Sequence, residues 1–182
     1  TEGGLVRWEG ERRRVWGLAE GLTSPLVRSM LVQIGPSGRE TVWAGTFGGL
    51  VRFTEGTWAS LDAQDGLPDN LVFSLHEDRR SGALWFGTAY GLVSYQEGRW
   101  RTHGAAEGLP RTTIFALAGD AEAVWVGTRG HGLYRLRGGR AEPVPGLPDS
   151  FVFALYAGPD ADGVPAVWAG TRQGLSRWKG GT

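Results

Sequence analysis

A four-residue motif recurs four times along this chain at nearly constant spacing. Each copy has the form Trp-Xaa-Gly-Thr and is followed three or four residues later by Gly-Leu. The tryptophans are separated by 42, 40 and 43 residues, and they are Trp43, Trp85, Trp125 and Trp168. A fixed period in the range of roughly 20–50 residues marks an array of one supersecondary unit. The repeat therefore predicts a fold built from copies of that unit, in which these prominent residues are mainly structural.

Each repeat contains four short segments with strand character. In the second full repeat they are residues 71–77, 83–88, 91–95 and 99–103, which are rich in apolar and aromatic residues and are separated by polar turns that contain glycine. We find no uninterrupted helical period of about 10–12 residues. Four antiparallel strands per repeat are typical of a propeller blade. We therefore predict an all-β β-propeller of four-stranded antiparallel blades, about four in this chain.

The motif residues have physical roles in such a blade. A tryptophan fills the wedge that opens between neighbouring blades away from the axis. The glycine allows close backbone approach, and the threonine hydroxyl can satisfy a buried backbone group. Space is short near the axis, and the matching position of each first strand carries a small residue. These small residues are Ser29, Ser74, Ala116 and Ala154.

The repeats divide the chain unevenly. Residues 1–24 contain the third and outer strands of an incomplete blade, residues 25–67, 68–109 and 110–147 each form a blade, and residues 148–182 form a blade that lacks its outer strand. Joining the two ends would cover strand edges that otherwise invite aggregation. The join would lie within one chain, giving four blades, or between two chains, giving an eight-bladed ring. A third alternative is an open fragment of a larger ring, and we expect the chain to be part of something longer.

Composition excludes several classes of function. Nineteen acidic and nineteen basic side chains cancel, so we expect no binding to nucleic acid or to an anionic membrane. The absence of cysteine removes disulfides, thiolate catalysis and cysteine metal sites. No apolar run approaches the ~18 residues of a membrane helix. The first residues have neither a basic start nor an apolar stretch, so we expect no signal peptide in this sequence. The basic cluster Arg12-Arg13-Arg14 is interpreted as protection of an outer strand edge.

The segment from Leu67-Pro68-Asp69-Asn70 through Trp85-Phe86-Gly87-Thr88 to Gly91-Leu92 resembles the two-component regulator propeller repeat. Two further copies end at Trp125 and Trp168, and the copy that ends at Trp43 departs most, because it lacks the Leu-Pro step. The resemblance implies a sensory module that lies outside the cytoplasmic membrane of bacteria, in the periplasm or outside the cell. It also implies a small-molecule or glycan ligand, with carbohydrate as the expected class, and frequent dimerisation. It supplies no fixed catalytic residues.

Two sets of loops are expected to share one face of the ring: the loop before each first strand and the loop between the second and third strands. The second set is where the repeats differ most, and a constant framework with variable loops is typical of a binding surface on a rigid scaffold. Aromatic side chains there can stack on a sugar ring, and arginines can donate paired hydrogen bonds to carboxylates or hydroxyls. The candidate ligand-binding residues are Phe47, Asp69, Asn70, Tyr90, Arg111, Arg129, His131, Asp149, Arg172 and Gln173.

Catalytic hypotheses are weaker. The three histidines, His76, His103 and His131, fall at different points of their repeats and show no metal-ligand spacing. A propeller lyase would need His131 with Asp69 or Asp149 and a divalent cation on one face. We therefore expect no enzyme, no cofactor and no metal site. Two alternatives stay open: a structural propeller whose role is dimerisation or contact with neighbouring repeats, and a propeller lyase.

Overall fold

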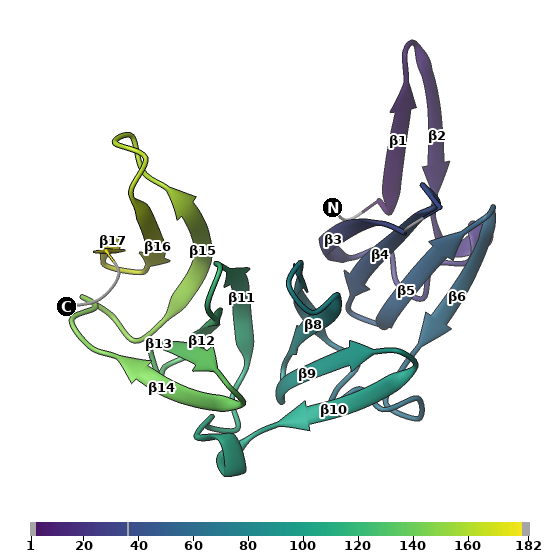
Figure 1. The fold of residues 1–182 in the computed structure, drawn as a ribbon. Coiled ribbons are helices and arrows are strands. Elements are labelled where there is room, and N and C mark those ends of the chain that lie inside the picture. The colour runs from purple at the N-terminus through teal and green to yellow at the C-terminus, as the bar shows by residue number, and fades with distance from the viewer. Residues whose placement is uncertain (1–2, 36, 180–182) are drawn as a thin grey trace.

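The chain folds into antiparallel sheets that follow one another along the sequence. The structure is a computed structural model that describes residues 3–35 and 37–179. Figure 1 shows the sheets side by side in an open arc, which confirms the predicted all-β propeller-like architecture. The first sheet is a hairpin of β1 (Leu5–Glu9) and β2 (Arg12–Trp16), and it is followed by three four-stranded blades and one three-stranded blade. The blades comprise β3 (Val27–Ile34), β4 (Glu40–Thr46), β5 (Gly49–Thr54) and β6 (Thr57–Leu61); β7 (Val72–Asp78), β8 (Ala83–Thr88), β9 (Gly91–Gln96) and β10 (Arg99–His103); β11 (Ile114–Gly119), β12 (Val124–Thr128), β13 (Leu133–Arg137) and β14 (Arg140–Val144); and β15 (Val152–Pro159), β16 (Pro165–Thr171) and β17 (Gly174–Lys179).

The first strand of each blade lies at the inner edge of the arc. Strand β7 contacts β3 on one side and β11 on the other, and β11 also contacts β15, whereas β10 and β14 lie on the convex side (Figure 1). The predicted small residues pair with the motif glycines, as Ser74 does with Gly87 and Ala116 with Gly127. Two small residues opposite each other leave room for the first strand of the next blade.

A β-bulge interrupts the pairing at the start of every first strand. In β7 the register passes from Val72 opposite Thr88 to Ser74 opposite Gly87, so Phe73 is the extra residue. A bulge changes the direction in which its side chain points. The equivalent extra residues in the other blades are Arg28, Phe115 and Phe153.

Indole rings fill the seams between blades, as predicted. Trp43 is 2 % exposed, and its ring centroid lies 5.8 Å from Phe86 and 6.0 Å from Tyr95, both in the next blade. Trp125 is fully buried and lies 4.8 Å from Trp178 in the following blade. Truncating such a ring to alanine typically costs about 3–5 kcal/mol, because a cavity remains. Trp43 and Trp125 therefore each hold one blade against the next.

The motif threonines close the loop between the second and third strands. The hydroxyl of Thr88 donates a hydrogen bond to the backbone carbonyl of Gly91 at 3.0 Å, and Thr128 donates to Gly132 at 2.7 Å. Both threonines are fully buried, so their hydroxyls satisfy backbone groups that water does not reach. This role is the one predicted for them.

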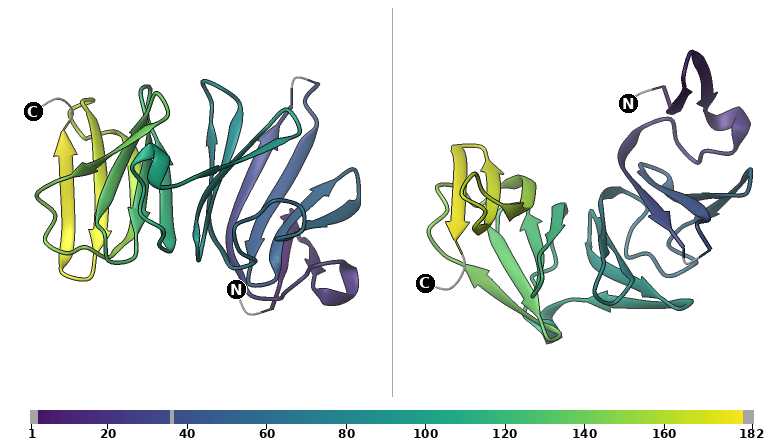
Figure 2. Two further views of the ribbon diagram at one scale, coloured as in Figure 1. Left: turned by 90° about the horizontal axis from the view of Figure 1, so that it is seen from below. Right: turned by 45° about the horizontal axis from the view of Figure 1, so that its top comes forward.

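The two ends of the described chain lie apart. Strands β1 and β2 form one sheet and β15 to β17 another, and Figure 2 shows them at opposite ends of the arc. Closure of a four-bladed ring within one chain is therefore not the arrangement observed. Within the described ranges, helical structure consists of two three-residue 3-10 turns, Leu18–Glu20 and Ala105–Glu107. No helix among the described residues has the length and apolar character needed to cross a membrane.

Candidate functional site

The two loop sets that carry the predicted ligand contacts are tied together by backbone hydrogen bonds across the blade seams. The N–H of Gly49 donates to the carbonyl of Asn70 at 2.7 Å, and the N–H of Gly130 donates to the carbonyl of Ser150 at 3.1 Å. The Asn70 side-chain oxygen accepts a further bond from the N–H of Ala63 at 2.9 Å. The loops therefore form one face whose backbone is held by the blades themselves.

Two predicted carboxylates on this face shape turns. The Asp69 side chain accepts a hydrogen bond from the N–H of Leu71 at 2.7 Å, and Asp149 accepts one from the N–H of Phe151 at 2.6 Å. A side-chain oxygen that bonds the backbone two residues later forms an Asx-turn. The hydrogen bond from the Phe151 N–H is the largest cause that holds the pKa of Asp149 below its usual value, and Arg172 lowers this pKa further.

A polar cluster at the β16–β17 loop combines three predicted residues. The Arg172 Nε lies 3.3 Å from one Asp149 oxygen, and the Gln173 amide donates to the same oxygen at 3.2 Å. The guanidinium carbon of Arg172 also lies 3.8 Å from the ring centroid of Phe151. The Arg172 side chain remains 54 % exposed, so it is held in place while part of its edge faces solvent.

The remaining polar candidates are exposed on the same face. Tyr90 is 56 % exposed, and the guanidinium carbon of Arg111 lies 5.3 Å from its ring centroid. Arg129 and His131, in the β12–β13 loop, are also exposed. A tyrosine beside an arginine offers an aromatic face and fixed donors to a ligand. These four residues stay predictions.

A belt of five phenylalanines crosses the inner edge of this face. Neighbouring ring centroids along the belt lie 5.1–6.3 Å apart. The bulges supply three of the rings, so each central ring meets its equivalent in the next blade. Five of the seven phenylalanines in the chain are in this belt. The aromatic belt, as we call it below, consists in spatial order of Phe47, Phe73, Phe115, Phe153 and Phe151.

Arginines lie at both ends of the aromatic belt. The guanidinium carbon of Arg28, the bulge residue of β3, lies 5.8 Å from the ring centroid of Phe47 and 5.9 Å from that of Phe73. Arg172 covers Phe151 at the other end. Arg172 uses its Nε and Nη2 to donate hydrogen bonds to Asp149, whereas Arg28 lies near two rings of the belt. The site is thus an apolar strip that terminates in cations.

Only Phe47 of the belt was among the predicted site residues. Phe73, Phe115 and Phe153 lie in first strands, and the candidate ligand contacts were sought in the loops. The available signal was the aromatic residue shared by Val72-Phe73-Ser74 and its two counterparts in the following blades. The position of this aromatic ring depends on the β-bulge at the start of each first strand, and the strand pattern in the sequence does not show where a bulge occurs.

Two of the three histidines have packing roles. His103 is 5 % exposed, its ring centroid lies 4.6 Å from that of Trp85, and its Nε2 lies 2.9 Å from the Ser94 hydroxyl. Burial lowers the pKa of His103 to about 4, and burial also lowers the pKa of His76. No group of three or more histidines and carboxylates among the described residues is placed to hold a metal ion.

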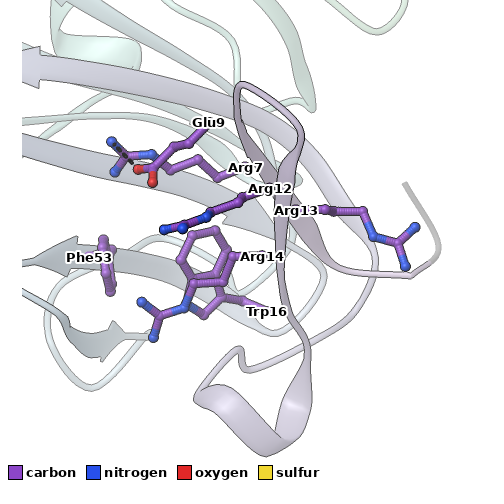
Figure 3. A pocket seen from close by; sticks show the side chains of 7 residues that line it. All are labelled: Arg7, Glu9, Arg12, Arg13, Arg14, Trp16 and Phe53. Atoms are coloured by element: carbon purple, nitrogen blue, oxygen red, sulfur yellow. Dashed lines mark ion pairs between the residues drawn. The ribbon is translucent and has the colours of Figure 1, made fainter.

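A pocket of about 370 Å³ lies between the β1–β2 hairpin and the first blade, as Figure 3 shows. Arg7 pairs there with Glu9 at 2.9 Å, and the guanidinium carbon of Arg14 lies 5.1 Å from the Trp16 ring centroid. At a complete seam this region holds a motif indole under an arginine, as in Trp43 under Arg52 at 5.7 Å. We therefore attribute the pocket to blade packing and assign it no ligand. Its lining residues are Arg7, Glu9, Arg12, Arg13, Arg14, Trp16 and Phe53.

Comparison with known proteins identifies similar structures but no relative by sequence. No protein-family model matches the chain, and no curated protein matches it. The extracellular domain of BT3049 from B. thetaiotaomicron, named as a hybrid two-component system, matches 94% of the chain with a TM-score of 0.75 and 20% identity. The extracellular domain of BT4673 from the same organism, named likewise, matches 100% with a TM-score of 0.77 and 22% identity.

A third similar structure is PorZ of Porphyromonas gingivalis, named as a surface component of the type-IX secretion system. It matches 92% of the chain with a TM-score of 0.64 and 16% identity, over 28% of its own length. The chain spans about a quarter of each B. thetaiotaomicron domain, at 24% in both cases. At these identities the comparisons establish the fold: this chain has the blade architecture of these three structures.

Proposed function

We propose that this chain is the ligand-binding part of a sensory propeller that acts outside the cytoplasmic membrane, as in a bacterial two-component signalling protein. Its blades are similar to those of two extracellular domains that are named as parts of two-component systems. The proposed role is binding rather than catalysis, with a carbohydrate or another small ligand recognised on the loop face.

The aromatic belt is the observation that carries this proposal. Phe47 is 38 % exposed and Phe153 is 48 % exposed, although both are large apolar rings. Phe73, Phe115 and Phe151 are half-buried, so the belt as a whole is partly exposed apolar surface, which is more often found at a binding site than elsewhere on a protein. The aromatic rings in the seams between blades differ from these, since the indoles of Trp43 and Trp125 are almost fully buried. Rings that only stabilised the blades would be expected in the seams, so the belt is suited to contact a partner molecule.

A thermal-shift screen of the chain against neutral and charged oligosaccharides tests the proposal. Any ligand found is then titrated by calorimetry into two variants of β15. Phe153→Ala removes a ring of the belt, and Tyr156→Ala removes a ring of similar exposure, 55 %, from the same strand outside the belt. We expect the first variant to weaken binding at least tenfold and the second to leave it unchanged.

Two outcomes would contradict the proposal. The first is the absence of any shift together with a stable dimer, which would favour the structural alternative. The second is magnesium-dependent turnover that disappears in His131→Ala, which would replace binding by catalysis.

A further inference from the structure

We infer that the pocket beside the β1–β2 hairpin is a docking site for a β-strand of another propeller blade that carries the sequence Trp-Xaa-Gly-Thr. The strand would pair with the edge of β1 that faces away from β2, and its indole would fill the pocket. This inference does not rest on the proposed function, because it concerns the hairpin and the first blade and leaves the loop face aside.

Strand β1 has the sequence of a third strand but only one of the two neighbours that third strands have. Within residues 3–35 and 37–179, β1 pairs with β2 alone, whereas β5, β9 and β13 each lie between a second and a fourth strand. The run Leu5-Val6-Arg7-Trp8 matches Leu175-Ser176-Arg177-Trp178 of β17. The edge of such a strand presents backbone donors and acceptors to an extended partner, which is the basis of strand addition.

The complete blades give the register in which a partner strand would pair. In the first blade Trp43 lies opposite Arg52, and in the last blade Trp168 lies opposite Arg177. Residues opposite each other in antiparallel strands share a face of the sheet, and each guanidinium carbon lies 5.7 or 5.3 Å from the indole centroid of its partner. The matching residue of β1 is Arg7, which lines the pocket (Figure 3). We therefore expect the tryptophan of the added strand to lie opposite Arg7, on the pocket side of the hairpin.

The far wall of the pocket matches the surface that receives an indole at a complete seam. Trp43 packs against Tyr95 in the third strand of the next blade, with ring centroids 6.0 Å apart, and Trp125 packs against Trp178 at 4.8 Å. Phe53 has the same place in its own third strand as Tyr95 and Trp178, and it lines the pocket. The pocket of about 370 Å³ therefore lies where the indole of an added strand would contact the first blade.

The first strand of the first blade carries an exposed apolar row. Met30, Val32 and Ile34 are 56, 44 and 67 % exposed. In the next blade Leu75 has the place of Met30, because each lies opposite the residue that precedes the motif glycine. Leu75 packs against the hydrophobic cluster that contains Trp43 of the preceding blade. We therefore expect Met30 to contact the blade that supplies the docked strand.

The hairpin is a poor partner for the last blade, so the docking edge is that of β1 and not that of β2. Within the described part of the chain, β17 pairs only with β16. If β2 joined β17 in the register that it has with β1, Arg14 would lie opposite Arg177 and Arg12 opposite Lys179. Like charges directly opposite each other destabilise a strand pair.

Fluorescence anisotropy with a labelled peptide tests the inference. The probe is a fluorescein-labelled peptide of residues 151–171, which comprises β15 and β16, and its control is the same peptide with Trp168→Ala. We expect the unmodified peptide to bind the chain at least tenfold more tightly than the control peptide. In the chain, Met30→Gln should weaken binding at least threefold, whereas Val15→Gln, which changes an exposed apolar residue on the other face of the hairpin, should leave it unchanged.

A second pair of variants tests the arginine that would cover the indole. Arg7→Gln should also weaken binding of the peptide at least threefold. Arg13→Gln is the matched control, because Figure 3 shows the Arg13 side chain pointing away from Arg7 and Phe53.

The outcomes are distinct. Equal binding of the two peptides, or no binding of the unmodified one, would overturn the inference, as would losses in Val15→Gln and Arg13→Gln as large as those in Met30→Gln and Arg7→Gln. Self-association of the chain in sedimentation velocity, abolished by Met30→Gln and retained by Val15→Gln, would support it and identify β16 of a second copy as the docked strand. The proposed function is tested separately, by Phe153→Ala on the loop face.

Discussion

The glycine of the Trp-Xaa-Gly-Thr motif allows a sharp test of how the blades pack. A Cβ at Gly87 would lie 2.7 Å from Cγ2 and 2.8 Å from the carbonyl oxygen of Ile114 in the next blade, and it would also meet the Ser74 hydroxyl. At Gly170, the same position of the motif, the nearest atoms would be Cβ and the carbonyl oxygen of Ala154, at 3.5 and 3.9 Å. Gly87→Ala therefore forces two blades apart, whereas Gly170→Ala makes ordinary contacts.

We expect Gly87→Ala to lower the free energy of unfolding and Gly170→Ala to raise it slightly. Overpacking of a well-packed interior costs about 1–3 kcal/mol, and relief of the clash at Gly87 requires movement of backbone. Neither Gly87 nor Gly170 is among the described residues with positive φ. Alanine in place of a glycine that has such a backbone conformation and enough space, as at Gly170, stabilises the folded protein by about 0.4–1 kcal/mol, because it reduces the number of conformations of the unfolded chain. The two variants should thus differ by roughly 1.5–4 kcal/mol, and each kcal/mol moves Tm by about 2–4 °C in a chain of this size.

Urea unfolding, followed by far-ultraviolet circular dichroism and by tryptophan fluorescence, measures the difference. Gly87→Ala should unfold at lower urea than the unmodified chain, and Gly170→Ala at the same or higher urea. Equal midpoints in the two variants would refute the seam packing described here, as would a larger loss in Gly170→Ala.

Three further predictions concern buried polar groups. Thr88→Val should cost about 1–2 kcal/mol because a buried backbone carbonyl loses its donor, whereas Thr171→Val, whose hydrogen bond is exposed, should be nearly neutral in the same urea assay; equal losses would contradict this. Asp120→Ala should cost about 1–3 kcal/mol, because the indole N–H of the fully buried Trp125 donates to Asp120 at 2.6 Å, and a melting temperature unchanged from the parent chain would disprove it. Burial lowers the pKa of His103 from 6.5 to about 4, so the unfolded chain binds a proton below pH 6.5 that the folded chain accepts only near pH 4. Stability should therefore fall as the pH decreases through this window, and urea midpoints of His103→Gln should fall less steeply; parallel slopes would argue against a neutral buried histidine.

The blade architecture could be predicted because its signals are local. The period of Trp43, Trp85, Trp125 and Trp168 and the glycine-containing turns determine where strands begin, end and reverse, and these preferences act within about forty residues. The hydroxyl of Thr88 reaches a carbonyl only three residues away, so its role was also predictable from the motif. The two loop sets of each blade could also be assigned to one face, because the direction of successive antiparallel strands alternates within a blade.

The composition of the candidate site was decided by the tertiary structure. Phe73 belongs to the aromatic belt because a bulge displaces it and because Phe115, in the neighbouring blade, lies 5.5 Å away. The pairing of Arg172 with Asp149 spans 23 residues and depends on how the last blade returns along the face. The repeated motif therefore determined the blades of this protein. The direction of the bulge side chains and the register between blades decided which residues meet at the inner edge, because these contacts depend on three-dimensional packing.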